Sequence, residues 1–117
     1  GRGCQEHDMT YRLTILSPSR NFLSMITSFH TNATANVWQG CFTKKLPNQI
    51  QEIARRKLRM INAAQRLDDL RIPPANCLEA LLGNRFGQHS IRINDQWRVC
   101  FVWNNGNADR VEICDYH

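Results

Sequence analysis

The sequence lacks any long apolar run, which argues against a protein with a membrane-spanning helix. A helix that crosses a membrane needs about 18 consecutive apolar residues, and no stretch of the 117 residues approaches that length. Residues 11–26 do not resemble a signal peptide, because Pro18, Ser19 and Arg20 interrupt their apolar pattern. We therefore expect no membrane partner.

Cysteine motifs are also missing, although cysteine itself is present. The five cysteines are Cys4, Cys41, Cys77, Cys100 and Cys114. Their odd number and the absence of C-x-x-C spacing argue against a disulfide framework and predict a cytoplasmic protein. Cys100 and Cys114, with His89 and His117, suggest a zinc site, but none of the usual ligand spacings is present. We therefore expect neither a metal ion nor another cofactor.

Acidic residues are scarce relative to basic ones. Ten Asp and Glu stand against fifteen Lys and Arg, so the formal net charge is +5. A basic domain of this size is typical of proteins that bind a polyanion or an acidic partner, although charge alone only predicts solubility. The length and the apolar content of 42% suit one compact domain with a single core.

Residues 1–24 differ from the rest of the chain. The first residue is Gly1 rather than methionine, and the apolar segment 14–16 is broken directly by 17–20. We interpret 1–24 as an extension that comes from a vector or from translation upstream of the true start, and 25–117 as the domain. The alternative is a genuine extension that packs on the domain.

The last third of the chain has the alternation of β-strands. Apolar and polar side chains alternate over 90–94, 97–103 and 111–114, which predicts three strands with one buried face each. The segments 94–96 and 104–107 have turn composition. With a three-residue first loop, Arg92 falls opposite Arg98 on the face away from the apolar residues. Because like charges repel, we expect an anion between them.

The first half of the domain predicts one strand and two helices. Residues 25–29 alternate weakly, as in a strand, and Thr31 would cap a short helix over 32–40. The main helix begins at Asn48, with Gln51 as the partner of a capping box, and 68–70 would form its last turn. Its apolar stripe comprises Ile50, Ile53, Ala54, Leu58, Ile61 and Ala64.

The other side of the main helix is basic. Arg55, Lys57 and Arg59 are candidates for contacts with RNA phosphates or an acidic partner, and the alternative is a solvated basic face.

We expect residues 74–87 to form an irregular connection to the sheet. The predicted class is α+β, with the order β-α-α-β-β-β and both helices on one face of a small antiparallel sheet.

Two motifs in this order resemble a known family. The pattern G-N-R-F-G-Q-H-S-I-R-I-N-D-Q-W-R-V-C-F-V-W, followed by V-E-I-C-D-Y-H at the end, is similar to the HigB toxins of the RelE/ParE superfamily. The segments M-I-T-S-F-H and A-R-R-K-L-R-M-I-N-A-A also resemble that family, so the likeness covers 25–117. It implies a RelE-like fold that agrees with the predicted order.

The resemblance also implies an activity and partners. HigB toxins act as ribosome-dependent endoribonucleases that cleave mRNA in the A site and inhibit translation. The implied partners are the 70S ribosome with its mRNA, and a HigA-type antitoxin, which is a helix-turn-helix protein. Operator DNA would be reached only through the antitoxin.

The residue chemistry agrees with metal-independent RNA cleavage, which needs a base, donors for the phosphate and an acid. Arg92 and Arg98 suit the phosphate, because guanidinium is planar and permanently charged. His117 suits the acid, since imidazole titrates near neutrality. Asp115 would orient a neighbour or act as the base, and Tyr116 would stack on a base or donate to the phosphate.

The sequence departs from the family at one motif. Some members carry L-H-P-L-K-G where this chain has L-E-A-L-L-G, so Glu79 replaces a histidine and Leu82 a lysine. Glu79 therefore becomes a candidate base, and His89 a candidate substrate contact.

Other interpretations stay open. Arg92 and Arg98 can be ordinary surface residues of the sheet, and His117 can be a loose terminus. The alternative functions are a non-catalytic module that binds nucleic acid or the antitoxin, and a ParE-like inhibitor of DNA gyrase. The terminal D-Y-H after an arginine-bearing sheet favours the nuclease.

Overall fold

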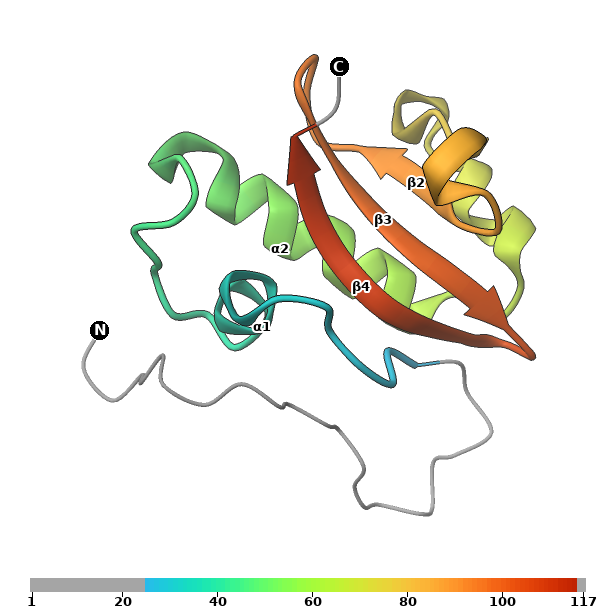
Figure 1. The fold of residues 1–117 in the computed structure, drawn as a ribbon, viewed down its shortest axis with the longest axis horizontal. Coiled ribbons are helices and arrows are strands. Elements are labelled where there is room, and N and C mark those ends of the chain that lie inside the picture. Colours follow the sequence, from blue (N-terminus) through green and yellow to red (C-terminus); the bar gives the residue numbers. More distant parts are fainter. Residues whose placement is uncertain (1–24, 116–117) are drawn as a thin grey trace.

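The computed structural model describes residues 25–115, and Figure 1 shows two layers, a sheet with a long helix behind it. The elements, in chain order, are α1 (Asn32–Trp38), α2 (Asn48–Ala63), the 3-10 helices η2 (Leu67–Arg71) and η3 (Pro74–Asn76), β1 (Glu79–Ala80), the 3-10 helix η4 (Gly83–Arg85), β2 (His89–Arg92), β3 (Trp97–Asn104) and β4 (Asn107–Asp115). Neighbouring strands are antiparallel, in the order β1-β2-β3-β4. α2 packs on β3 and β4, and α1 packs on α2 and β4. The predicted α+β class is confirmed; the extension assigned to 1–24 lies outside the described residues.

The register predicted for the first hairpin is confirmed. Arg92 pairs with Arg98, and the Ile93 N–H donates to the carbonyl of Trp97 at 2.8 Å. The Asn94 side chain closes the loop, because its Oδ1 accepts from the N–H of Trp97 at 2.8 Å. Local turn chemistry and the two faces of the strands therefore specify the same pairing.

A two-residue turn joins β3 to β4. Asn105 and Gly106 have φ values of 54° and 84°. Positive φ at both central residues is typical of the type I′ turn, whose twist matches that of the flanking strands. The predicted turn over 104–107 is thus confirmed.

Residues 25–29, predicted as the first strand, lie along the outer edge of β4. Their two isolated bridges, both parallel, join Ile26 to Ala108 and Phe29 to Val111. Between the bridges Arg110 has a φ of 53°, which interrupts the extended backbone of β4 there. The segment returns to the sheet as predicted, but it does not form a continuous strand.

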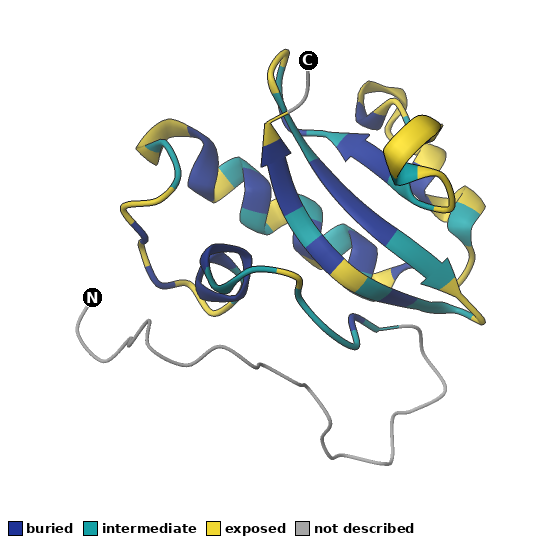
Figure 2. Ribbon diagram, viewed as in Figure 1, coloured by how far each residue is buried: buried dark blue, intermediate teal, exposed yellow. Residues whose placement is uncertain are grey.

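The core lies between α2 and the sheet. Its most deeply buried side chains, none more than 2% exposed, include Ile50, Ala54, Leu58 and Ile61 of α2 and Ile91, Val99, Phe101 and Val111 of the strands. Figure 2 shows these buried stretches facing one another across the two layers. Full burial of one such aliphatic or aromatic side chain contributes about 1.5–3 kcal/mol. The predicted stripe is confirmed, with Ile53 half-buried at its margin.

Gln51 does not form the predicted capping box. The N-cap position of α2 is Pro47, which makes no side-chain cap hydrogen bond. Gln51 instead donates from Nε2 to the carbonyls of Thr43 at 2.7 Å and Leu46 at 2.9 Å, and its Oε1 accepts from the Thr43 N–H at 3.1 Å. The buried amide therefore fastens the preceding loop to the helix.

The end of α2 and one short strand also differ from the prediction. α2 ends at Ala63, and residues 68–70 belong to η2 instead of a last turn. The Asp69 carboxylate accepts from the backbone N–H groups of Gln65 at 2.9 Å and Arg66 at 3.1 Å, so a new turn starts there. The segment expected to be irregular contains β1, which is too short to show any alternation in the sequence.

Candidate active site on the open sheet face

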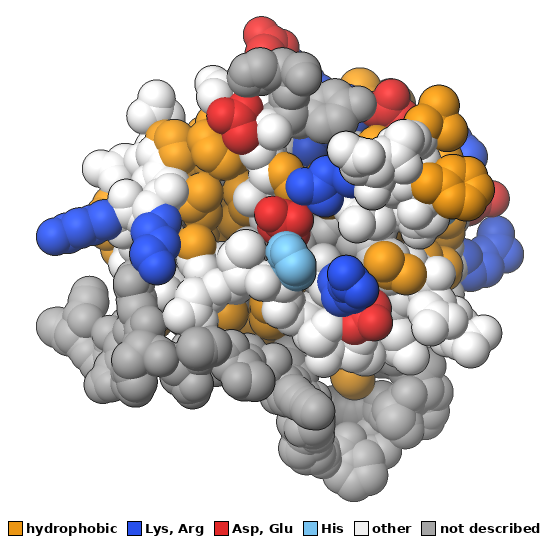
Figure 3. Space-filling view, in the orientation of Figure 1, with side chains coloured by type: hydrophobic (Ala, Val, Ile, Leu, Met, Phe, Trp, Pro, Cys, Tyr) orange, Lys and Arg blue, Asp and Glu red, His pale blue; other side chains and the backbone are white. Residues whose placement is uncertain are grey.

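The sheet has one face away from α2, and the alternation of the strands decides which side chains occupy it. Ile91 and Val99 point into the core, so their neighbours point the other way. The side chains on this open face are Ser90 and Arg92 of β2, Arg98 and Cys100 of β3, and Glu112 and Cys114 of β4. Figure 3 looks onto this face and shows basic side chains next to acidic ones.

Arg98 is held across three strands. Its Nη1 donates to the Ser90 hydroxyl at 2.8 Å and lies 3.4 Å from the backbone carbonyl of Cys77. The same nitrogen is 3.3 Å from Oε1 of Glu79, and the Arg98 side chain is only 13% exposed. Glu79 is opposite Ser90 in the register of β1 and β2. The guanidinium is thus fixed in position, with a carboxylate beside it.

Arg92 has its own acidic partner. It forms an ion pair with Asp95, which lies in the loop after β2, and 34% of its side chain is exposed. The repulsion between the two paired arginines is therefore offset by the protein's own carboxylates, Asp95 for Arg92 and Glu79 for Arg98. The sequence predicted an anion between the arginines; the structure places acidic side chains on their outer sides.

Ser90 was missed by the sequence-based reasoning. Its place on the open face follows from its position between His89 and Ile91, because alternate residues share a face. Ser90 is fully buried and accepts the hydrogen bond from Arg98. The alternation of side chains along β2 is therefore a signal in the sequence that identifies Ser90.

Asp115 is the last residue of β4. It pairs in register with Trp97, so it belongs to the side of the sheet opposite Arg98. Its Oδ2 accepts from Nε2 of Gln96 at 3.1 Å. Tyr116 and His117 lie outside the described residues, so their roles stay predictions.

The basic residues of α2 separate into two groups. Lys57 donates from Nζ to Oδ1 of Asn76 at 2.7 Å. Burial lowers the pKa of Lys57, and the nearby charges of Arg56 and Arg92 lower it further. The charge of Arg92 thus influences the pKa of Lys57.

Arg55 and Arg59 belong to a different part of the helix surface. Arg55 donates from Nε to the carbonyl of Trp38 at 3.2 Å, and its guanidinium lies against Gly40. Arg59 is exposed one turn further along α2. The predicted phosphate contacts of α2 therefore do not form one surface: Lys57 adjoins the arginine pair, and Arg55 adjoins α1.

His89 faces the core rather than the arginines. Its ring stacks on Phe101 with the centroids 6.4 Å apart, and its Nδ1 is buried without a hydrogen-bond partner. Burial lowers the pKa of His89, and the charge of Arg71 lowers it further. The contact of His89 with substrate stays a prediction.

We expect His89 to make stability pH-dependent. Its folded pKa is below the unfolded value of 6.5, so the unfolded state binds more protons once the pH falls below about 6.5. Stability should be complete above that pH, fall as the pH drops through it, and level off below the folded pKa. Urea midpoints at pH 7.5 and 5.5 should differ less for His89→Phe than for the wild type. An equal difference in both proteins would contradict this prediction.

Over 25–115, no group of three or more His, Cys, Asp or Glu side chains is arranged to hold a metal ion. No helix in that range is long and apolar enough to cross a membrane.

Comparison with known proteins gives consistent matches. Residues 27–117 match the family described as RelE-like toxin of type II toxin-antitoxin system HigB. A protein named Toxin HigB-1 from Vibrio cholerae is 48% identical over 63 residues, which cover 54% of this chain and 66% of that protein. An uncharacterized protein from Haemophilus influenzae is 37% identical over 69 residues, 59% of this chain and 68% of its own length. The chain thus matches about two thirds of the length of each relative.

Proposed function

We propose that this chain, which belongs to the HigB family of RelE-like toxins from type II toxin–antitoxin systems, cleaves mRNA in the A site of the translating ribosome. The observation that carries the proposal is the arrangement around Arg98, a nearly buried guanidinium with Glu79 at 3.3 Å on an open sheet face. Guanidinium binds phosphate oxygens with two parallel hydrogen bonds. A carboxylate next to a bound phosphate is placed to act on the neighbouring ribose.

Each step of strand cleavage has a candidate among these side chains. Glu79 takes the proton from the 2′-hydroxyl, and the 2′-oxygen attacks the adjacent phosphorus. Arg98 and Arg92 hold the negative charge that builds on the pentacoordinate phosphate. His117 gives a proton to the leaving 5′-oxygen, and Tyr116 stacks on a base. The products are a 2′,3′-cyclic phosphate and a new 5′-hydroxyl, and no metal ion takes part.

The exposed fractions of the Glu79 and Arg98 side chains suggest how a substrate phosphate replaces Glu79 on Arg98. Glu79 is 48% exposed and Arg98 is 13% exposed. Glu79 can therefore turn toward solvent while Arg98 stays in place, held by Ser90. A substrate phosphate that replaces the carboxylate on Arg98 leaves Glu79 without its cation. The freed carboxylate is then available to accept the ribose proton.

The two basic groups of α2 suit different partners. Lys57, beside Arg92, extends the cationic surface along which an RNA backbone can lie. Arg55 and Arg59 suit an acidic segment of a HigA-type antitoxin that neutralises the toxin. Separate surfaces would allow the antitoxin to bind without competing for every phosphate contact.

The experiment that tests the function is a translation reaction with purified ribosomes and a defined mRNA. Primer extension on the recovered mRNA should show new 5′ ends at in-frame codons of the A site, and these cuts should disappear when a HigA-type antitoxin is added. Intact mRNA on ribosomes that carry the bound protein would contradict the proposal and favour a non-catalytic binding module. DNA damage in cells with translation intact would instead favour a gyrase inhibitor.

A further inference from the structure

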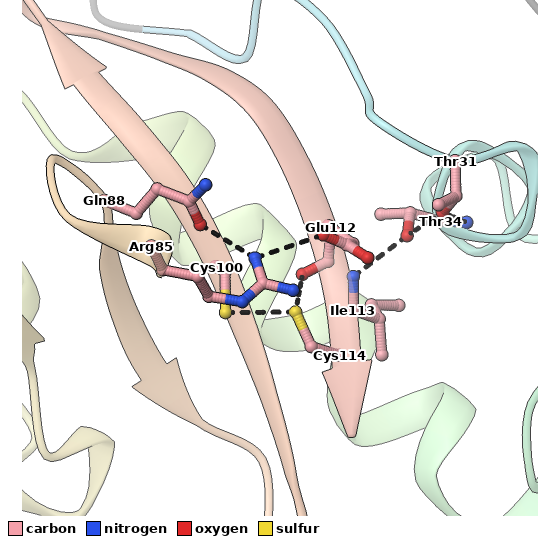
Figure 4. A network of polar contacts seen from close by, with 8 residues as sticks. All are labelled: Thr31, Thr34, Arg85, Gln88, Cys100, Glu112, Ile113 and Cys114. Carbon is pink, nitrogen blue, oxygen red and sulfur yellow. Dashed lines mark hydrogen bonds and ion pairs between the residues drawn. The ribbon is translucent and has the colours of Figure 1, made fainter. Parts of the chain in front are cut away.

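Two thiols lie side by side on the open face, next to Arg98. Cys100 of β3 and Cys114 of β4 have their Sγ atoms 3.1 Å apart, and both residues are buried at 0% and 5% exposure. Leu81 packs against both. In the register, Cys114 is opposite Arg98 and Cys100 is opposite Glu112, so the two cysteines are diagonal neighbours. Figure 4 shows the two sulfur atoms turned toward each other.

A cation lies close to the pair. Arg85 is the last residue of η4, and its Nη1 lies 2.9 Å from Oε1 of Gln88 and 3.3 Å from Oε1 of Glu112. Figure 4 shows its guanidinium beside the sulfur of Cys114. An electropositive surrounding of this kind is what makes a cysteine reactive, because the thiolate is the nucleophile.

The pKa values of the two thiols shift in opposite directions. The Cys114 thiol donates a hydrogen bond to Cys100. That hydrogen bond lowers the pKa of Cys100; burial opposes the change, and the charge of Arg85 supports it. The same hydrogen bond and burial raise the pKa of Cys114. Cys100 is thus the better nucleophile, and Cys114 keeps its proton.

We propose that Cys100 and Cys114 are a modification site, where a peroxide converts the two thiols into a reversible intrachain disulfide. The S–S bond is about 2.05 Å long, so the sulfur atoms must approach by about 1 Å. A change of this size needs only small rotations of the two side chains. The site does not depend on the nuclease proposal, because no group of that mechanism takes part in it.

The reaction balances with hydrogen peroxide as the oxidant. The Cys100 thiolate attacks one peroxide oxygen, the O–O bond breaks, and Cys100 becomes a sulfenic acid while the other oxygen leaves as water. The Cys114 sulfur then attacks the Cys100 sulfur, and the S–OH group leaves as a second water with the proton of Cys114. Two thiols and one peroxide thus give one disulfide and two waters.

The cover over the sulfur atoms is a short loop. Gly83 and Gly87 flank this segment, with φ values of 63° and 97°, and no atom lies within 4 Å of the place that a Cβ would occupy on either residue. The guanidinium of Arg85 contacts the side chains of Gln88 and Glu112 and remains partly exposed, and the Arg85 backbone N–H donates to the carbonyl of Leu82 at 3.2 Å. A small peroxide therefore needs only a local displacement of this loop to reach Cys100.

The test uses the full chain with Cys77→Ser, which removes an exposed thiol. The folded protein is treated with hydrogen peroxide, remaining thiols are alkylated, and the chain is digested with trypsin without a reductant. Trypsin cleaves after Arg98 and Arg110, so peptides 99–110 and 111–117 should appear joined, about 2 Da lighter than their sum. Dithiothreitol should release them. In the matched variant that also carries Cys114→Ser, a sulfenic acid reagent should label Cys100 instead.

Three results would overturn the proposal. The first is full alkylation of both cysteines after peroxide treatment of the folded protein, which would mean an inert buried pair. The second is a joined peptide that forms only in denaturant. The third is a bridge from Cys100 or Cys114 to another cysteine in place of the expected bridge. Circular dichroism before and after treatment establishes that the protein tested is folded.

Discussion

Arg98→Ala should lower the rate of mRNA cleavage on the ribosome by about 10²–10³-fold, the loss typical of removing one donor that stabilises transition-state charge. Arg98 is the more buried arginine of the pair and is oriented by Ser90, so its donors are already in position before substrate binds. The rate is measured in single turnover with saturating ribosomes, where only the chemical step is followed. Binding to the antitoxin should change little, because Arg98 lies away from Arg55.

Two control variants accompany Arg98→Ala: one keeps the positive charge at position 98, and the other removes a surface arginine elsewhere. Arg98→Lys keeps the positive charge but loses the planar fork, so it should recover only part of the lost rate. Arg71→Ala removes an arginine that pairs with Asp68 on the surface, and it should cleave like the wild type. A folded Arg98→Ala protein with an unchanged rate would mean that Arg98 is structural and that phosphate is held elsewhere.

Glu79→Gln should also have a large effect, a loss of about 10²–10⁴-fold, since this is the usual contribution of a general base. The amide keeps the shape of the side chain and can still accept from Arg98, but it cannot take a proton. Glu79→His places at this position the residue type that other family members carry, and it should retain substantial activity.

Asp68→Asn is the matched control for Glu79→Gln. It removes a surface carboxylate that also pairs with an arginine, and we expect no change in the rate. If Glu79→Gln cleaves as fast as Asp68→Asn, Glu79 is only the resting partner of Arg98. The base would then have to come from another part of the chain.

Local patterns were enough to predict the hairpins. The loop 94–96 and the pair at Asn105 and Gly106 have turn chemistry that acts within a few residues, and period-two alternation then sets the faces. The same rule, applied consistently, would have placed His89 with Ile91 on the core face. The proposed contact of His89 with substrate comes from the family motif rather than from the strand, and it stays a prediction.

The remaining differences from the sequence-based prediction come from contacts between distant segments. Gln51 fits a capping box by spacing, but Pro47 takes the N-cap position and the loop at Thr43 offers the amide better partners. The closeness of Glu79 to Arg98 depends on β1, a strand of two residues that has no periodicity of its own. The resemblance to the HigB family drew attention to Glu79, but only the three-dimensional pairing of β1, β2 and β3 brings it beside the arginine.

Residues 25–29, which run parallel to β4 along its outer edge, limit how a second protein chain can attach to this sheet. A partner that binds by adding a strand needs a long edge with unpaired backbone groups. Ile26 and Phe29 bridge one outer strand of the described sheet, and the other outer strand is only the two residues of β1. Neither edge is suited to extend into a larger sheet with a neighbour. We therefore expect a partner of this domain to contact side chains of its helices and open face rather than a sheet edge.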